Sequence, residues 1–396
     1  MIQLEAATKK IQLDHMPENT LKLGIIGGAL DSAVGRCHHI AAQMDGRFRI
    51  VAGCFSPNSG NNLATAMALD VPEARTYNDW RNFIQAERSQ IDAVLLLTPT
   101  PMHAEMAVAA LELKVPVISE KPMCVSSAEA STILAARDKN DGFVAVTYNY
   151  TGYPMVRELR GMIREGRLGR LTHVSAEMPQ EGFLTLVGID SSKPIPQAWR
   201  LKDHFIPMVS LDLGVHLHHL IWFLTGECPL EVTAMQQSQG HFEGLVDNIQ
   251  CLARYTRDLP VQMWYGKTAL GYANGLRIRI FGMEGSAEWV QMNPEFLVLN
   301  DNRGNSSVTS RSASGLKICN QERYTRFKAG HPSGFIEAFA NYYYDIADWL
   351  LEFRSGKKSS HEMVAGLEIA KEGLIMMESI SSSSFQKTWK PNIENT

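Results

Sequence analysis

A lysine and an aspartate–histidine pair are the side chains of this chain best suited to chemistry. Lys121 follows an apolar run and precedes Pro122, which cannot donate to a sheet ladder, so we expect Lys121 at the carboxyl edge of a strand. A lysine there can hydrogen bond a substrate hydroxyl. Asp212 and His216 stand at positions i and i+4, which lie on one face of a helix. A carboxylate beside an imidazole stabilises the protonated ring, and such a pair suits proton transfer near neutral pH.

Less specific interpretations of the same residues remain open. Lys121 can be an ordinary solvated loop lysine. The histidines 216, 218 and 219 with Asp212 resemble a set of metal ligands, but a helix cannot direct the adjacent residues His218 and His219 at one ion, so we predict no metal site. For His219 we expect a core position under Trp222.

The elements that would position Lys121 alternate between strand and helix from residue 21 to residue 148. Apolar runs predict the strands, and helical patterns lie between them. This alternation predicts a Rossmann-like, doubly wound parallel sheet, in which ligands bind at the carboxyl ends of the strands. The expected strands are 23–26, 49–55, 93–97, 115–118 and 143–147, and the expected helices lie near 40–44, 77–87, 104–113 and 126–137.

A glycine-rich turn follows the first predicted strand. Gly27, Gly28 and Gly35 precede a helical pattern, an arrangement that presents backbone N–H groups to a dinucleotide pyrophosphate. The spacing departs from G-x-G-x-x-G, because Ala29 occupies the place of the second glycine. At the end of the second strand, near Ser56, neither an acid for NAD nor an arginine for NADP is evident. We expect NAD or NADP, with a slight preference for NAD.

The composition is that of an ordinary globular protein with two domains. The chain has 396 residues, 45% hydrophobic and 20% charged, and its 38 basic and 42 acidic side chains are interspersed. This charge pattern supports neither nucleic-acid binding nor membrane attachment. Residues 1–20 are polar and lack the apolar core of a signal peptide, so we expect a loosely held extension. Six scattered cysteines favour a reducing cytoplasm.

The remainder of the chain, 149–396, predicts an α/β domain with a large, mostly antiparallel open sheet. Its open face would need a cover, and pairing into a homodimer or homotetramer is a common solution. We expect a mobile loop at 301–314, helices near 334–353 and 361–380, and the end of the ordered chain at 381–384. The expected strands are 230–236, 247–255, 260–265, 276–281 and 286–291.

Several motifs occur in a characteristic order and spacing from residue 21 to the C-terminal helix. They are Gly24-Ile25-Ile26-Gly27-Gly28, Thr98-Pro99-Thr100 with His103, Glu120-Lys121-Pro122 and Asp212-Leu213-Gly214-Val215-His216. In these motifs the chain resembles the glucose-fructose oxidoreductase / inositol dehydrogenase (Gfo/Idh/MocA) family. Segments 148–154, 274–278 and 331–341 are similar to a branch of the family that has a lengthened glycine loop.

The resemblance implies roles for the residues introduced above. Lys121 would bind the reacting hydroxyl, Asp212 would position the sugar ring, and His216 would act as acid and base. The expected cofactor contacts are Gly27, Gly28, Ala29, Ser56, Thr98, Pro99, Thr100, His103, Glu120 and Lys121. The expected substrate contacts are Asn149, Tyr153, Trp199 and Arg200.

The expected function is NAD(P)-dependent hydride transfer between the nicotinamide and a hydroxyl of a sugar, inositol or related polyol. Redox-neutral cleavage of glycosides with a retained NAD is one alternative. A non-catalytic sensor of dinucleotide or sugar is another, although a sensor has no need for the proton-transferring residues. Residues 202–204 replace the glycine-rich run usual in the family, so the shape of the substrate pocket is not given by the resemblance.

Overall fold

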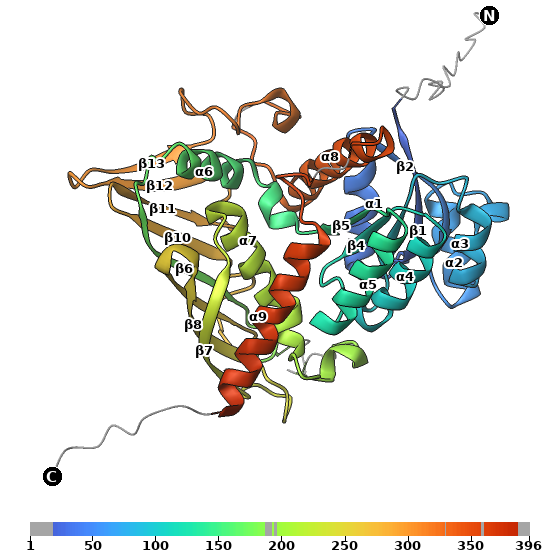
Figure 1. Cartoon of the computed structure of the whole chain (residues 1–396), viewed down its shortest axis with the longest axis horizontal. Coiled ribbons are helices and arrows are strands. Elements are labelled where there is room, and N and C mark those ends of the chain that lie inside the picture. The colour runs from blue at the N-terminus through green and yellow to red at the C-terminus, as the bar shows by residue number, and fades with distance from the viewer. Residues whose placement is uncertain (1–18, 187–191, 194–195, 329, 358–359, 387–396) are drawn as a thin grey trace, which may run out of the picture.

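The computed structural model describes residues 19–386, except 187–191, 194–195, 329 and 358–359. Two sheets lie side by side, with helices between them (Figure 1). The predicted N-terminal extension, 1–20, falls almost entirely outside the described residues. Within the described part of the chain, no helix is both long enough and apolar enough to cross a membrane.

The first sheet is parallel and has the strand order β2-β1-β3-β4-β5, which confirms the predicted Rossmann-like domain. Its central strands are buried on both faces because they consist almost entirely of apolar residues. The strands are β1 (Leu21–Gly27), β2 (Phe48–Cys54), β3 (Ala93–Leu97), β4 (Val117–Glu120) and β5 (Val144–Thr147). The helices are α1 (Ala33–Gln43), α2 (Ser59–Ala68), α3 (Trp80–Glu87), α4 (His103–Glu112) and α5 (Ser127–Lys139).

The second sheet has eight strands in the order β13-β12-β11-β10-β6-β9-β8-β7. All neighbours are antiparallel except β6 and β9, so the prediction of a mostly antiparallel sheet is confirmed. The strands are β6 (Leu171–Pro179), β7 (Pro229–Gln237), β8 (Asn248–Tyr255), β9 (Leu259–Gly266), β10 (Arg277–Gly282), β11 (Gly285–Val290), β12 (Phe296–Asp301) and β13 (Ser306–Ser310). The prediction of a mobile loop at 301–314 is wrong for residues 306–310, because they form β13 and pair with β12.

Helices α6 (Pro154–Arg164), α7 (Val215–Thr225) and α9 (Leu367–Gln386) lie between the second sheet and the first domain (Figure 1). The predicted end of the ordered chain at 381–384 is wrong, because α9 continues to Gln386. Side chains along β8 alternate between the two faces of the sheet, and those on the face away from these helices are exposed. Leu252 is one of the exposed side chains. A groove of about 460 Å³ crosses this face between β6, β7, β8 and β9.

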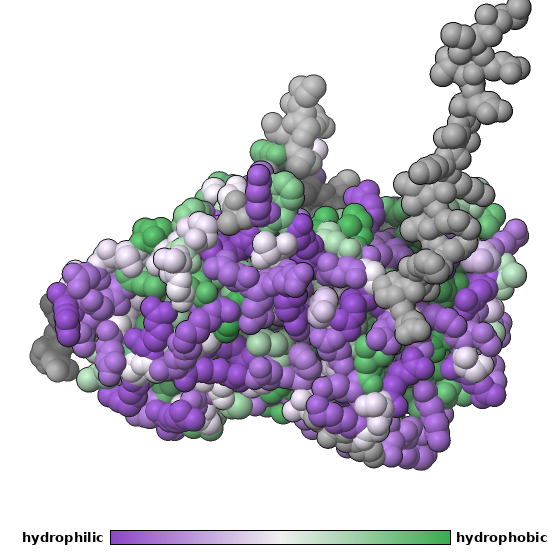
Figure 2. All heavy atoms as spheres, turned by 90° about the horizontal axis from the view of Figure 1, so that it is seen from above, coloured by the Kyte–Doolittle hydropathy of each residue, from purple (hydrophilic) through white to green (hydrophobic). Residues whose placement is uncertain are grey.

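Helix α8 (Phe335–Arg354) follows the second sheet in the chain but packs on α1 of the first domain (Figure 1). Ion pairs Arg47–Asp348, at 2.5 Å, and Arg326–Asp45 join these regions. Figure 2 shows the molecule from above, where hydrophilic residues cover most of the surface and hydrophobic residues form small separate patches. The two domains therefore share a buried junction under a polar surface.

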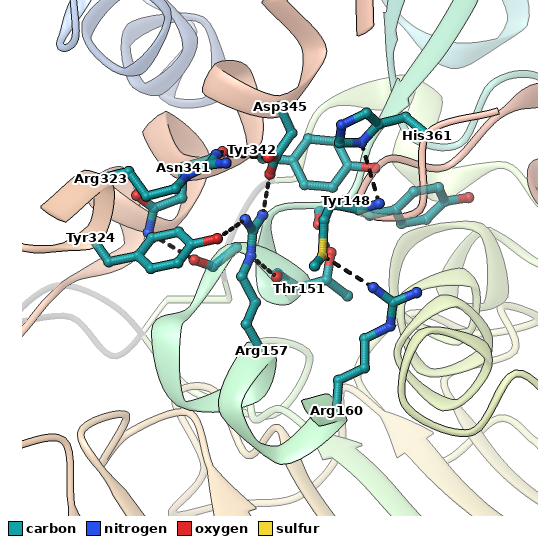
Figure 3. A network of polar contacts seen from close by, with 12 residues as sticks. Tyr148, Thr151, Arg157, Arg160, Arg323, Tyr324, Asn341, Tyr342, Asp345 and His361 are labelled. Atoms are coloured by element: carbon teal, nitrogen blue, oxygen red, sulfur yellow. Dashed lines mark hydrogen bonds and ion pairs between the residues drawn. The ribbon is translucent and has the colours of Figure 1, made fainter. Parts of the chain in front are cut away.

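A buried ion pair lies at this junction (Figure 3). Arg157 of α6 and Asp345 of α8 are 0% and 1% exposed, and Arg157 Nη2 lies 2.6 Å from Asp345 Oδ2. Arg157 also donates to the Thr151 carbonyl at 2.9 Å and to the Tyr324 hydroxyl at 2.6 Å. Arg323 binds the other carboxylate oxygen of Asp345 at 2.6 Å. The cluster fixes the 3₁₀ turn that follows β5, because Thr151 belongs to that turn, Asn149–Gly152.

Candidate active site

Lys121 joins the edge of the first sheet to the second domain. It follows β4 directly, as predicted, and its Nζ donates to the Asp212 carbonyl at 2.7 Å and to Asp212 Oδ1 at 3.2 Å. The Lys121 side chain is 12% exposed, so it is not an ordinary solvated lysine. Sequence positions far apart in the chain therefore meet at the carboxyl edge of a parallel sheet, the usual ligand site of such folds.

Asp212 lies within a π-helical turn, Ser210–Gly214, immediately before α7. Such turns are rare and often occur at functional sites. Its second oxygen, Oδ2, contacts Lys267 at 2.8 Å and Arg200 at 3.1 Å. Burial alone would raise the pKa of this carboxyl, but Lys267, Lys121 and Arg200 together hold the pKa well below its usual value. Asp212 is therefore ionised and can hold three cationic groups in fixed positions.

Lys267 is a residue of this cluster that the sequence analysis missed. It follows the last residue of β9, Gly266, and its side chain is 17% exposed. A lysine after a strand is a common pattern and does not by itself indicate a site. The tertiary structure brings Lys267 to Asp212, because β9 pairs with β6 and lies against the turn that contains Asp212.

His216 lies one turn beyond Asp212, on α7, and is buried against aromatic rings. Its ring meets that of Tyr150 edge-on with 4.7 Å between centroids, and Tyr148 lies 6.0 Å away. Burial and the charge of Lys121 lower the pKa of His216 well below its usual value, although the Asp212 charge acts in the opposite direction. Burial and the Lys121 charge therefore outweigh the stabilisation of the protonated ring by Asp212, and the imidazole of His216 is neutral near pH 7. Its role as acid and base stays a prediction.

Glu120, the last residue of β4, is held by two side chains. His38 Nε2 lies 3.1 Å from Glu120 Oε2, and the Thr147 hydroxyl donates to the same oxygen. Burial alone would raise the pKa of Glu120, but the contacts with His38, Lys121 and Thr147 lower the pKa below its usual value. Glu120 is thus an ionised carboxylate directly beside Lys121.

The predicted cofactor residues after β3 are held together by His103. Its Nε2 lies 2.8 Å from the Thr98 carbonyl, and its Nδ1 lies 3.0 Å from the Pro122 carbonyl. The ring is buried and both nitrogens face backbone oxygens, so His103 fixes the loops after β3 and β4 relative to each other. Pro99 and Thr100 lie at the start of the short 3₁₀ helix, Thr100–Met102, that follows β3. Direct contact of these residues with a cofactor stays a prediction.

The glycine turn after β1 has the geometry that a dinucleotide requires. Gly27 and Gly28 have φ of 82° and 68°, values that favour glycine. A Cβ on Gly35 would lie 2.4 Å from the Gly28 carbonyl oxygen, so the turn packs directly on the start of α1. The first-turn N–H groups of a helix have no intrahelical acceptor and suit a phosphate. In α1 the Ser32 hydroxyl accepts from the Gly35 N–H at 3.0 Å, and no acidic residue occupies the first turn. With Ala29 between them, these residues fit the pyrophosphate of NAD or NADP.

The turn after β2 is neutral. Ser56 is buried and its Oγ accepts a hydrogen bond from Asn58 N at 3.2 Å, while Asn58 caps α2. The segment 55–63 contains no charged side chain. A 2′-phosphate would find no arginine in this segment, and the carboxylate typical of NAD sites is also absent.

The structure brings some of the predicted substrate residues to the cluster and not others. Arg200 contacts Asp212, and its guanidinium lies 4.5 Å above the Trp199 ring. Tyr153, in contrast, is buried against Trp289, and its hydroxyl accepts a hydrogen bond from Gln291 at 3.0 Å. Asn149 is buried, and its side-chain nitrogen has no hydrogen-bond acceptor among the described residues. In the described part of the chain, no hydrogen bond or ion pair joins Asn149 or Tyr153 to the Asp212 cluster.

The neighbouring histidines have separate environments. His218 pairs with Glu372 of α9 at 3.0 Å, whereas His219 stacks on Tyr148 with 4.2 Å between centroids. Among the described residues, no group of three or more histidine, cysteine or carboxylate side chains is arranged to hold a metal ion.

Comparison with known proteins gives the class of this architecture. A family model described as "Oxidoreductase family, NAD-binding Rossmann fold" matches residues 21–148, and one described as "GFO/IDH/MocA C-terminal domain" matches residues 156–288. The uncharacterized oxidoreductase YfiI of Bacillus subtilis (strain 168) is 30% identical over 336 residues, which cover 83% of this chain and 84% of YfiI. The chain thus belongs to the Gfo/Idh/MocA family of oxidoreductases, as the motifs predicted.

Relatives with stated activities support the assignment. An inositol dehydrogenase homolog from Azotobacter vinelandii, solved with NADH and myo-inositol, superimposes with a TM-score of 0.84 at 26% identity, covering 93% of this chain and 97% of that chain. A D-xylose 1-dehydrogenase (NADP+) of Haloarcula marismortui is 27% identical over 250 residues, or 62% of this chain and 65% of that enzyme. The protein described here is an NAD(P)-dependent dehydrogenase.

Proposed function

We propose that the enzyme transfers a hydride between a CH–OH carbon of a sugar, inositol or related polyol and the nicotinamide of NAD. The observation that carries this proposal is the meeting of Lys121, Asp212 and His216 at the carboxyl edge of the parallel sheet. The relatives that act on D-xylose or were solved with myo-inositol support the same substrate class.

The side chains divide the work of the reaction. The nicotinamide, when bound, supplies the hydride acceptor. Lys121 donates a hydrogen bond to the hydroxyl that reacts, and neutral His216 removes the proton of that hydroxyl. Asp212 is ionised and holds Lys121 and Arg200 in place, and its cluster can orient further hydroxyls. Proton removal by His216 and hydride loss from the carbon leave a carbonyl group.

Absorbance of reduced nicotinamide tests the proposal. Purified protein is incubated with NAD or NADP and a panel of sugars, inositols and glycosides, after any bound nucleotide has been identified by mass. We expect reduced cofactor to accumulate with a polyol or sugar, and faster with NAD than with NADP, because the turn after β2 offers no arginine for a 2′-phosphate. Glycoside cleavage without accumulation, or nucleotide binding without any turnover, would contradict the proposal.

We also propose that a second copy of the chain covers the open face of the eight-stranded sheet. The groove on this face and the 58% exposure of Leu252 at its centre support the proposal. Substituting Leu252→Arg should convert dimers or tetramers into smaller species in light scattering coupled to size exclusion. Leu63→Arg, on the first domain, is the matched control and should leave the mass unchanged. A parent protein that is monomeric would contradict the proposal.

We propose that the protein is cytoplasmic, because its cysteines form no disulfide bonds. All six cysteines are free, which is typical of a reducing compartment.

A further inference from the structure

A chain of hydrogen-bonding side chains runs from α8 to the residue before Lys121. Tyr343 Oη lies 2.6 Å from His38 Nδ1, and His38 Nε2 lies 3.1 Å from Glu120 Oε2. The hydroxyl of Thr147, from β5, donates to the same carboxylate oxygen. His38 is 0% exposed and the Glu120 side chain is 13% exposed, so the chain leads from the buried domain junction to a carboxylate that reaches the site.

When the His38 imidazole carries one proton, a single arrangement satisfies both of its contacts. Ionised Glu120 can only accept, so the imidazole N–H faces it, and Nδ1 is left to accept from the Tyr343 phenol, whose pKa burial and the Glu120 charge raise well above its usual value. The ring proton is then on Nε2 and points at Glu120. Phe339 packs against the imidazole with 4.7 Å between centroids and restricts its rotation. The tautomer of His38 is therefore set from both sides, by Glu120 of β4 and by Tyr343 of α8.

Glu120 is left with one oxygen for a ligand. His38 and Thr147 both bind Oε2, and no hydrogen bond to Oε1 is found among the described residues. Because Lys121 is the next residue, any movement of Glu120 also moves the lysine that contacts Asp212. A fixed carboxylate at this position accepts a hydrogen bond from a hydroxyl or amide of the bound cofactor or substrate.

We propose that His38 is a positioning residue of this dehydrogenase, which holds Glu120 through its Nε2–H while Tyr343 helps to fix the tautomer. The proposal rests on the proposed function for its catalytic consequence. His38 itself touches no reacting atom, and it acts through Glu120 and the adjoining Lys121.

Two substitutions at position 38 separate positioning from packing. Replacing His38→Gln keeps an N–H at nearly the place of Nε2, whereas His38→Leu keeps bulk but removes the donor. We expect His38→Leu to lower kcat/KM by about 10- to 100-fold, the usual range for a hydrogen bond to a charged group, and His38→Gln to recover most of that loss. Circular dichroism confirms that each variant is folded.

The pH dependence of kcat/KM in the two variants provides a second test, because a change in packing alone would not shift it. Without the His38 donor, burial acts on Glu120 with less opposition, so the carboxyl protonates at higher pH and the acid limb of kcat/KM moves upward in His38→Leu only. The other titratable groups around Glu120 come from several elements and are the same in both variants. They are Cys37, His103, Lys121, Tyr148, Tyr150 and Tyr343.

A measurement without turnover keeps this proposal separate from the proposed function. In protein labelled with ¹⁵N-histidine, the resonances lost in His38→Gln identify His38, and their shifts should show the Nε2–H tautomer in the parent. Equal kcat/KM in the Leu and Gln variants, or an Nδ1–H tautomer in the parent, would overturn the proposal. A parent without dehydrogenase activity would contradict only the proposed function, because the tautomer is still measured.

Discussion

Replacing His216 with asparagine should lower kcat for hydroxyl oxidation by about 10²- to 10⁴-fold, the usual contribution of a positioned acid or base. His216 is buried against Tyr150 and Tyr148 beside the Lys121–Asp212 contact, where the reacting hydroxyl is proposed to bind. The glycine turn that fits the dinucleotide belongs to the other domain, so nucleotide affinity, followed by fluorescence of bound NADH, should be nearly unchanged.

The pH dependence of the parent enzyme has a defined direction. The proposed oxidation requires the imidazole in its neutral form, and burial together with the Lys121 charge lowers the pKa of His216 well below 6.5. The protonated form is thus scarce at neutral pH, and kcat/KM for oxidation should fall only when the pH drops well below 6.5. In His216→Asn the part of this acid limb that belongs to the imidazole should disappear, and protonation of Glu120 should set the limb that remains.

A matched histidine substitution controls for nonspecific effects. His331 is exposed and packs on Phe327, and His331→Asn should leave kcat and the pH profile unchanged. An acid limb at or above pH 6.5 in the parent, or a His216→Asn variant with nearly full kcat, would show that another group moves the proton.

The fold could be predicted where burial on both faces makes a strand uniformly apolar. The strands of the parallel sheet, such as β3, follow directly from that pattern. Strand β6 was missed because its buried face carries Val174, Ala176 and Met178, of which only valine is typical of strands. Strand β13 was missed because its Ser-rich sequence is exposed and is stabilised by pairing with β12.

The site could be predicted only where its residues belong to sequence motifs. Lys121, Asp212 and His216 were found this way, and Arg200 was found through its tryptophan neighbour. The contact of Lys267 with Asp212 depends on strand order, which short-range patterns do not give. The low pKa of His216 also escaped prediction, because burial outweighs a carboxylate one turn away and burial is set by distant aromatic residues.

The second large effect is expected at the buried ion pair in Figure 3, where Arg157→Met should reduce the free energy of unfolding by about 3–5 kcal/mol. The substitution leaves the carboxylate of Asp345 buried with Arg323 as its remaining partner, and it removes the donors to Thr151 and Tyr324. The shift of the urea denaturation midpoint, followed by tryptophan fluorescence, measures the effect.

An exposed ion pair provides the control for Arg157→Met. Lys317 and Glu165 lie 2.7 Å apart, and their side chains are 70% and 45% exposed, so Lys317→Met should leave the denaturation midpoint nearly unchanged. Equal midpoint shifts in the two variants would show that the Arg157 pair is not important for stability.

The same substitution should also affect catalysis, because the Arg157 cluster holds the turn that carries Tyr150. Arg157 binds the Thr151 carbonyl, and Asn341 of α8 binds the Gly152 carbonyl at 2.8 Å. Tyr150, in the same turn, supports His216 edge-on. Below the unfolding transition, folded Arg157→Met should therefore show a reduced kcat, whereas folded Lys317→Met should not. An unchanged kcat in Arg157→Met would separate the stability of the domain junction from the geometry of the site.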